Sequence, residues 1–396
     1  MKIRYGLILL AAVMLLAGCA GFWNAPTTST TTTTTSTTLS SGVFYVLNQT
    51  TKQIAVYTIS TGTLEQVSGS PYNLSSAPTS IAVAPGGGFL YVGTVSGIYL
   101  YSIESGGALT IGNGGAVISS DIPAAMHVSG SWLIDTFSPA SGSVQLDAIP
   151  INASTGAYTG LGPEPSQAFN VSNASATQMV LSPDATNLFV ALGAGGTIVV
   201  PFTSGNANPL GSSATVIPVV TSGASALSVA VDPTNRLFYI GETLAVSDSG
   251  GLRVFNYSSL GTGTPRSSPS QITGSPIASG GLSPNAILPI ASGEYVYVAN
   301  GQGNTGSGNV TWFPISVSGT TYTVAAGSTI ASGVVPAGLA EDSEDNFVLA
   351  VSNGGSTSSG DPDLEAFTMS SGALTAAIAT YTGTDPVGAN AVAALP

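Results

Sequence analysis

The chain has 396 residues, of which 6% are charged and 50 are glycine, and its formal net charge at pH 7 is −13. With only six Lys and Arg residues it lacks the cations that bind phosphates, which argues against nucleic acid as a partner. Its single Cys excludes a Cys-ligated zinc or iron–sulfur centre and an intrachain disulfide framework.

Residues 1–18 have the order of a secretory signal peptide. Lys2 and Arg4 form its charged start, residues 6–16 form a short apolar run, and the sequence LAGC follows at 16–19. LAGC resembles the lipobox of bacterial lipoproteins, in which the Cys is acylated and becomes the mature N-terminus. The resemblance implies lipidation of Cys19. Because Ala20 rather than Asp follows, it also implies the outer membrane or the cell surface as the location.

Residues 19–41 are predicted to form a tether. Residues 27–38 contain ten Thr and two Ser, with no apolar periodicity that a core could bury. Such composition is typical of disordered chain. We therefore expect this segment to hold the rest of the protein away from the membrane.

Residues 42–396 contain one repeated block of strands. The first strand is a short apolar alternation after a Pro or a small residue, as in 78–85 (PTSIAVAP), 176–183 (ATQMVLSP) and 226–233 (ALSVAVDP). An aromatic strand follows, as in 237–240 (LFYI), and a third strand comes after a Gly-rich loop, as in 252–257 (LRVFNY). Several copies add GALT or GAYT before a fourth strand. The β-branched and aromatic content, the alternation and the Gly/Pro punctuation predict β-strands.

The spacing of these blocks predicts the number of blades in a β-propeller. First-strand blocks recur from Pro78 to Pro386, which is 308 residues in six intervals of about 51, so residues 42–396 hold about seven units. Residues 42–75 supply only the later strands of a unit, and residues 386–396 supply only a first strand. We expect an all-β, seven-bladed propeller with four antiparallel strands per blade, closed by pairing of the N-terminal strands with the C-terminal strand.

The blocks also resemble a known family. The segments 78–85 and 235–240 (NRLFYI), with GALT after a third strand, look like the seven-bladed lactonase propellers. That family includes 6-phosphogluconolactonase-like and muconate-cycloisomerase-like proteins, and it is similar to surface propellers with Tyr-Val-Thr-Asn repeats. The resemblance covers residues 42–396 and implies the fold. It implies activity less strongly, because one fold carries many functions.

Enzymes of this family are thought to use His and Arg in a central cleft, so the resemblance directs attention to two residues. His127 lies in a first strand, one residue out of step with the family's His, and Arg253 lies at the start of a third strand. A lactonase would use His127 as general base and Arg253 to stabilise the oxyanion. Each also has a structural interpretation, His127 as a residue packed between blades and Arg253 as a salt-bridged residue. Candidate ligand-binding residues at or near the loops between second and third strands are Lys52, Arg253, Asn300 and Asn353.

No metal site and no cofactor are predicted. Residues 341–346 (EDSEDN) lack the spacing and the mid-loop Gly of an EF-hand and fall at a tight turn, which favours a solvated turn over a Ca²⁺ site. Residues 361–365 (DPDLE) are interpreted in the same way. The Gly-rich runs join strand to strand and open no helix, so they do not form a phosphate loop.

Two functions remain open from the sequence. The first is a non-catalytic binding or scaffold module of the cell envelope, a monomer held in the membrane through Cys19, with a surface glycan or an envelope protein as its partner. The second is a lactone hydrolase acting on an uncharged extracytoplasmic lactone, since a phosphosugar would need more converging cations. The scarcity of catalytic groups favours the first. Convergence of His127 and Arg253 on one cleft would favour the second.

Overall fold

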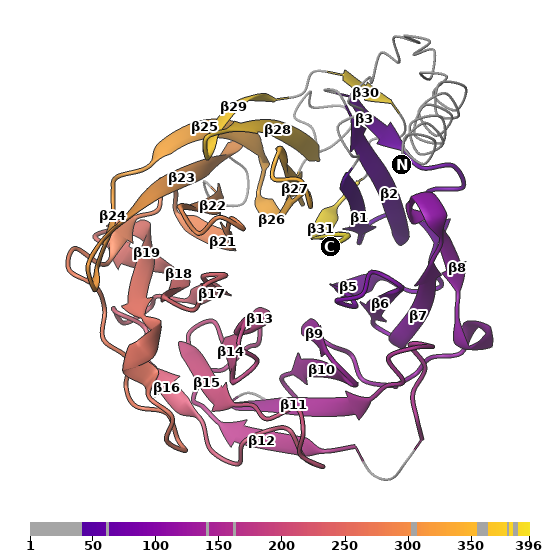
Figure 1. Ribbon diagram of the computed structural model, residues 1–396, viewed down its shortest axis with the longest axis horizontal. Coiled ribbons are helices and arrows are strands. Elements are labelled where there is room, and N and C mark those ends of the chain that lie inside the picture. Colours follow the sequence, from indigo (N-terminus) through magenta and orange to yellow (C-terminus); the bar gives the residue numbers. More distant parts are fainter. Residues whose placement is uncertain are drawn as a thin grey trace, which may run out of the picture. The chain divides into compact units, whose positions relative to one another are not determined.

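The computed structural model describes residues 42–60, 63–139, 142–160, 164–301, 307–354, 363–377, 380–382 and 387–396. Cys19 and the predicted signal peptide and tether therefore lie outside the described residues. The described part of the segment Leu39–Pro396 is built from seven separate β-sheets arranged in a ring (Figure 1). The predicted seven-bladed, all-β propeller is confirmed.

Each sheet is one blade, and its strands follow one another outward from the axis. The innermost strands are β5 (Pro78–Val83), β9 (Ala125–Ser129), β13 (Gln178–Leu181), β17 (Ala226–Val231), β21 (Ser283–Pro289), β26 (Pro336–Glu341) and β31 (Ala389–Ala394). The second strands are β6 (Phe89–Thr94), β10 (Trp132–Phe137), β14 (Asn187–Ala191), β18 (Leu237–Val246), β22 (Tyr295–Gly301), β27 (Phe347–Ser352) and β1 (Gly42–Asn48). We number the blades 1 to 6 in this order and call the last one the closing blade.

The outer two strands of each blade complete the sheets. The third strands are β7 (Gly97–Ile103), β11 (Ser143–Pro150), β15 (Thr197–Pro201), β19 (Ser249–Asn256), β23 (Ser307–Ser318), β28 (Leu364–Ser370) and β2 (Gln53–Ser60). The fourth strands are β8 (Leu109–Ile111), β12 (Ser166–Asn170), β16 (Thr215–Ile217), β20 (Ile277–Ala278), β24 (Thr321–Val324), β29 (Ala373–Ala377) and β3 (Thr63–Gln66). Three short 3-10 turns are also present, η1 (Ser105–Gly107), η2 (Asn113–Gly115) and η3 (Tyr257–Leu260). Among the described residues, none of the helical segments has the length and apolar character to cross a membrane.

The ring closes where the two ends of the propeller pair. The C-terminal strand β31 is the innermost strand of the closing blade and runs antiparallel to β1, with Phe44 opposite Ala394 and Leu47 opposite Ala391. This confirms the predicted closure. The structure adds three strands that the four-strand pattern did not contain, β4 (Tyr72–Asn73) beside β2, β25 (Ser328–Val334) beside β23, and β30 (Thr380–Thr382) parallel to β3.

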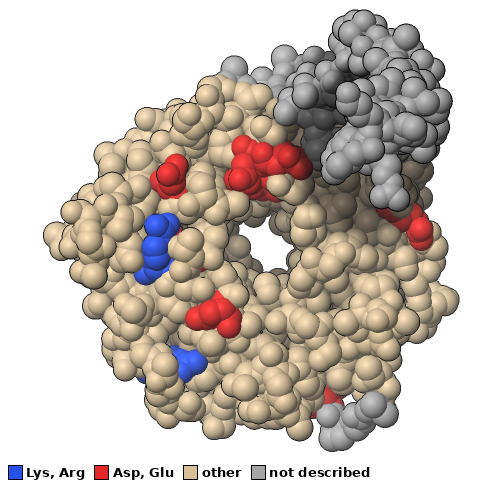
Figure 2. Space-filling view, in the orientation of Figure 1, with Lys and Arg blue, Asp and Glu red and all other residues tan. Residues whose placement is uncertain are grey.

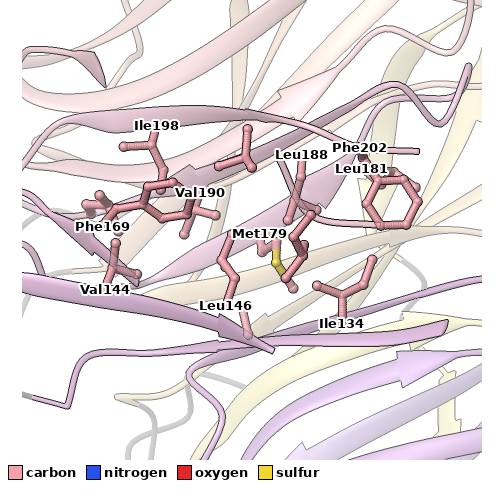
Figure 3. Close-up of a cluster of buried hydrophobic side chains, with 14 of the residues drawn as sticks. Ile134, Val144, Leu146, Phe169, Met179, Leu181, Leu188, Val190, Ile198 and Phe202 are labelled. Atoms are coloured by element: carbon pink, nitrogen blue, oxygen red, sulfur yellow. The ribbon is translucent and has the colours of Figure 1, made fainter. Parts of the chain in front are cut away.

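The hydrophobic core is divided among the interfaces between blades, because each second strand is buried on both faces. In β14, Leu188 and Val190 pack toward blade 2, whereas Phe189 and Ala191 pack toward blade 4. Figure 3 shows the first of these interfaces, where Leu188, Val190 and Met179 lie near Ile134 and Leu146 of blade 2. Two-sided burial explains why apolar residues run continuously along the strands and why so few charges are present.

The innermost strands are joined by side-chain hydrogen bonds from one blade to the next. At five of the seven interfaces, a hydroxyl or amide near the start of one inner strand donates to a carbonyl at or just before the start of the next. The pairs are Ser80 to Pro123 (3.3 Å), Thr177 to Ala226 (3.5 Å), Ser228 to Pro284 (2.7 Å), Asn285 to Pro336 (2.8 Å) and Asn390 to Pro78 (3.4 Å). These bonds fix the inner edges of the blades against one another around the axis.

One of these joints also explains a glycine in the middle of a strand. Gly241 lies on β18 beside the Ser228–Pro284 hydrogen bond, and a Cβ at this position would collide with the Ser228 hydroxyl and lie 2.8 Å from the Pro284 carbonyl oxygen. A side chain at residue 241 would therefore push blades 4 and 5 apart.

We expect Ser228→Ala to lower the free energy of unfolding by about 1–2 kcal/mol, because it removes a buried hydrogen bond between two blades. Denaturant unfolding of the variant and of the parent chain measures the change. Ser258→Ala, at an exposed position in η3, is the matched control and should have almost no effect. Equal stability of the two variants would contradict a role for this hydrogen bond in joining the blades.

Candidate functional site

A channel runs along the axis of the ring. Its cavity of about 210 Å³ is lined by three consecutive residues near the start of each of six inner strands, among them Ser80, Met126, Gln178, Asn285 and Leu339. The space-filling view shows an opening at the centre of the ring, bordered mainly by uncharged residues, with the charged side chains in small separate groups (Figure 2). The channel is therefore chemically neutral, and its lining residues are small, apolar or amide-bearing.

The channel widens at the end where the inner strands begin. A second cavity of about 450 Å³, which we call the channel mouth, is lined by Thr177, Leu227, Asn285, Val335, Ala337, Asn353 and Gly354. Thr177, Asn285 and Ala337 also line the channel, so the two cavities adjoin. Thr177 and Asn353 are exposed. The Thr177 hydroxyl donates to backbone carbonyls and can still accept a hydrogen bond from a ligand, and Asn353 offers an amide.

Some polar groups along the channel are already used, and others are not. The amide nitrogens of Asn285 and Asn390 donate to carbonyls of the next blade, which fixes both side chains. The Asn390 Oδ1 atom and the Thr79 hydroxyl are buried without a hydrogen-bond partner, and both residues line the channel. An uncharged ligand or water in the channel could satisfy these atoms.

His127 lies on the inner strand β9, directly opposite Ile134 of β10. The residue is only partly accessible to solvent. Burial lowers the pKa of its imidazole from 6.5 to about 4, so the imidazole is neutral at pH 7. The residues of this strand segment that line the channel are 124–126, and His127 itself is not among them. A neutral imidazole can accept a proton, but this one does not face the channel mouth.

Arg253 lies on β19, the third strand of blade 4, and is 6% exposed. Its guanidinium donates to Glu242 Oε2 (2.8 Å) and to the Pro218 carbonyl (2.8 Å), and its carbon atom Cζ lies 5.1 Å from the centre of the Phe255 ring. Glu242, itself fully buried, also accepts the backbone N–H of Val220. Arg253 is thus held by an ion pair inside its blade.

The structure does not bring His127 and Arg253 together. Blade 3 separates the blades that carry them, and neither residue lines the channel or its mouth. The two groups that a lactonase interpretation requires therefore do not share one of these cavities.

The other candidate binding residues have three different environments. Lys52 is exposed in the turn between β1 and β2. Asn300 is fully buried, and its amide donates to the Ser279 carbonyl (2.7 Å) and to the Thr311 hydroxyl (3.1 Å), which makes it part of the interior of blade 5. Only Asn353 lies at the channel mouth.

Four polar residues of the channel could have been found from the repeat. Thr79, Thr177, Asn285 and Asn390 each occupy the position after the Pro or Ala that opens an inner strand. Because inner strands meet around the axis, this position forms a ring of polar residues in the channel. The signal was present in the repeated blocks but is spread over four copies.

The acidic turn 341–346 is used for local structure. Asp342 accepts the backbone N–H groups of Asn346 (2.8 Å) and Phe347 (2.6 Å), and Glu341 accepts that of Ala291 in blade 5 (3.0 Å). Among the described residues, the one group of three acidic side chains close enough to hold a metal ion is a different set, Asp121, Asp135 and Asp147. These residues are far apart in the sequence and come from different segments, so no motif revealed them.

Glu341 and His127 change stability in opposite directions with pH. Burial, together with the nearby Asp345 and Asp342, raises the pKa of Glu341 from 4.5 to about 7, so its protonated form favours the fold and stability rises as pH falls through 7. The pKa of His127 is lowered from 6.5 to about 4, so its neutral form favours the fold and stability is lost as pH falls from 6.5 through 4. Over this range the two effects offset each other.

The comparisons with known proteins concern the fold. No protein-family model and no curated protein matches the chain. Among solved structures, candidate 6-phosphogluconolactonases from Bacteroides uniformis and Bacteroides fragilis are 14% and 16% identical, with TM-scores of 0.66 and 0.65. The two matches cover 89% and 91% of this chain and 99% of each of the two solved chains. The Pseudomonas aeruginosa periplasmic gluconolactonase is 17% identical, with a TM-score of 0.65 over 90% of this chain and 99% of that one.

The chain is therefore a seven-bladed β-propeller with the fold of the 6-phosphogluconolactonase-like proteins. This agrees with the resemblance seen in its repeated blocks. At these identities the likeness defines the architecture, and the activity has to be argued from the residues of this chain.

We expect Arg253→Met to lower the free energy of unfolding by about 3–5 kcal/mol, because it leaves the buried Glu242 carboxylate without its cation. Adding Glu242→Gln to the same chain should recover a large part of that loss. Urea unfolding measures both effects, with Lys52→Met, at an exposed turn, as the control of small effect. An Arg253 variant as stable as the Lys52 variant would mean that the guanidinium is free to bind a ligand.

Proposed function

We propose that this protein is a lipid-anchored, extracytoplasmic propeller that binds an uncharged polar ligand at its channel mouth and does not hydrolyse it. The observation that carries the proposal is the lining of the mouth, in which hydroxyl, amide and apolar groups are combined with no charged side chain. Such a surface suits the hydroxyl groups and apolar ring faces of a neutral glycan. An envelope protein presenting a polar, uncharged segment is the other partner with matching chemistry.

The separation of the candidate catalytic groups supports the non-catalytic part of the proposal. General-base catalysis requires the base to lie within hydrogen-bond reach of the substrate, and oxyanion stabilisation requires a donor aimed at the same carbonyl. His127 and Arg253 belong to blades that are not adjacent, and the guanidinium of Arg253 is already bound to Glu242.

A lactone hydrolase remains the alternative, and two observations favour it. The solved structures that share this fold include proteins described as lactonases, and His127 is neutral at pH 7, as a general base must be. In that case the lactone would be uncharged and extracytoplasmic, and the reaction would depend on His127.

We expect the full chain to bind neutral oligosaccharides on a glycan array, and Asn353→Ala to weaken the strongest binding by about tenfold, as expected for one lost hydrogen bond. Asn206→Ala, at an exposed position on blade 3 away from the mouth, is the matched control.

In parallel, hydrolysis of a panel of uncharged lactones by the wild-type chain should not exceed hydrolysis by the His127→Ala variant. Turnover that His127→Ala abolishes would establish the lactonase instead. Binding to envelope proteins but to no glycan would identify the other partner.

We expect the anchor to depend on Cys19. Cells fed a clickable fatty acid should label the wild-type chain, whereas Cys19→Ala should lose the label and leave the membrane fraction. Thr27→Ala, in the predicted tether, is a control that should keep both properties. An unlabelled wild-type chain would contradict lipidation.

A further inference from the structure

Three carboxylates converge between blades 1 and 2, away from the channel. Asp135 lies on β10, Asp147 lies directly opposite it on β11, and Asp121 lies in the segment that leads from blade 1 into β9. One carboxylate oxygen from each residue lies within 4.8 Å of the others. We call these three residues the interblade carboxylates.

Asp135 is the most unusual of the three. It is 0% exposed, and neither of its carboxylate oxygens receives a hydrogen bond of normal geometry. Leu133, two residues earlier on the same face of β10, packs in the core cluster that blades 1 and 2 share, so Asp135 also points toward blade 1. A buried carboxylate without a partner is costly, and such a group requires a specific explanation.

Other acidic residues lie near Asp135. Burial and the nearby Asp121, Asp147 and Glu164 raise the pKa of Asp135 well above its ordinary value, and the backbone N–H of Asp147 offsets this only in part. Burial and the same two aspartates also raise the pKa of Glu164. The described Lys and Arg residues belong to the closing blade and to blade 4, and His127 lies on the other face of blade 2. No basic side chain described in blades 1 and 2 therefore neutralises the group.

The geometry points to a binding site for one hard divalent cation, Ca²⁺ in particular, held by Asp121, Asp135 and Asp147. Ca²⁺ binds carboxylate oxygens at about 2.3–2.6 Å, so two of its ligand atoms can lie up to about 5 Å apart. The spread of the three oxygens fits within that limit. Glu164, just before β12, adds a further negative charge in the vicinity of these three residues.

The other two aspartates are prepared for this role by their neighbours. Gln145 donates to both carboxylate oxygens of Asp147, at 3.1 and 3.0 Å, and the Ser119 hydroxyl donates to Asp121 Oδ2 at 2.5 Å. Hydrogen bonds of this kind orient metal-binding carboxylates. Because Asp121 belongs to the connection between two blades, a bound cation would fasten that connection onto blade 2.

The site is independent of the proposed function at the channel mouth, since the two sets of residues have no member in common. To test the site, the full chain is freed of metal with EDTA and desalted. It is then titrated with CaCl₂ at pH 7.5 in a calorimeter. We expect one Ca²⁺ per chain and a rise of about 2–5 °C in the thermal midpoint at saturation. Mg²⁺ at the same concentration should give a smaller rise.

Two variants and a control identify the ligands. Asp135→Asn should abolish the heat of binding and, without Ca²⁺, should melt above the wild-type chain because it removes a buried charge. Asp121→Asn, in a connecting segment rather than a core strand, should weaken Ca²⁺ binding at least tenfold. Glu104→Gln, at an exposed acidic position of blade 1, should leave binding unchanged.

Two results would overturn the site. One is a wild-type chain whose midpoint does not respond to Ca²⁺ but rises as the pH falls from 8 to 5, with that rise lost in Asp135→Asn. The raised pKa of Asp135 would then mean that a proton, not a cation, neutralises the group, since a carboxyl of raised pKa stabilises the fold as pH falls. The other is an unchanged response to Ca²⁺ in Asp135→Asn.

Discussion

Burial of each blade on both faces is the constraint on which the rest of this structure depends. A strand in the middle of a blade contacts the neighbouring blade on either side, so it has no face on which a charge could remain hydrated. The second strands β14 and β27 are buried along their whole length. Most of the described charged residues lie in turns and connections or form pairs, such as Arg253 with Glu242 and Arg236 with Asp232. The buried Asp135 and Asp147, on strands of blade 2, are exceptions. The 6% charge content follows from this architecture.

The architecture could be predicted because it repeats. Each copy of the block carries the same order of strands, so a strand that is hard to assign in one copy can be assigned from the others. The period of about 51 residues sets the number of blades. The closure was predictable for the same reason, since the strands missing at one end of the chain are those present at the other. The additional strands β4, β25 and β30 occur in one blade each, and a single occurrence leaves no periodic signal.

The candidate site was less predictable, because side-chain partners come from other strands. The sequence predicts Arg253 at the start of a third strand, but β19 begins at Ser249, so Arg253 lies inside the strand. Its partner Glu242 is on β18, and the ion pair depends on the register between the two strands. The sequence likewise predicts that Asn300 lies in the loop after a second strand, yet the residue belongs to β22 and its amide turns inward to Ser279 and Thr311. The interblade carboxylates, separated by 14 and 12 residues, meet only because β10 and β11 pair and the connecting segment passes beside them.

The channel and the interblade carboxylates differ in how many of their polar groups already have hydrogen-bond partners. In the channel, Asn285 and Asn390 are already committed to carbonyls of the next blade, which holds the inner strands at fixed positions. A ligand at the mouth would therefore meet a rigid frame and would gain most from the exposed Thr177 and Asn353, with little ordering of side chains to oppose binding. Between blades 1 and 2, by contrast, the buried Asp135 carboxylate has no hydrogen-bond partner of normal geometry, and no neighbouring basic side chain of the described residues neutralises it. The same two-sided burial that keeps charges out of the strands leaves this buried carboxylate of blade 2 to be neutralised by a partner from solution.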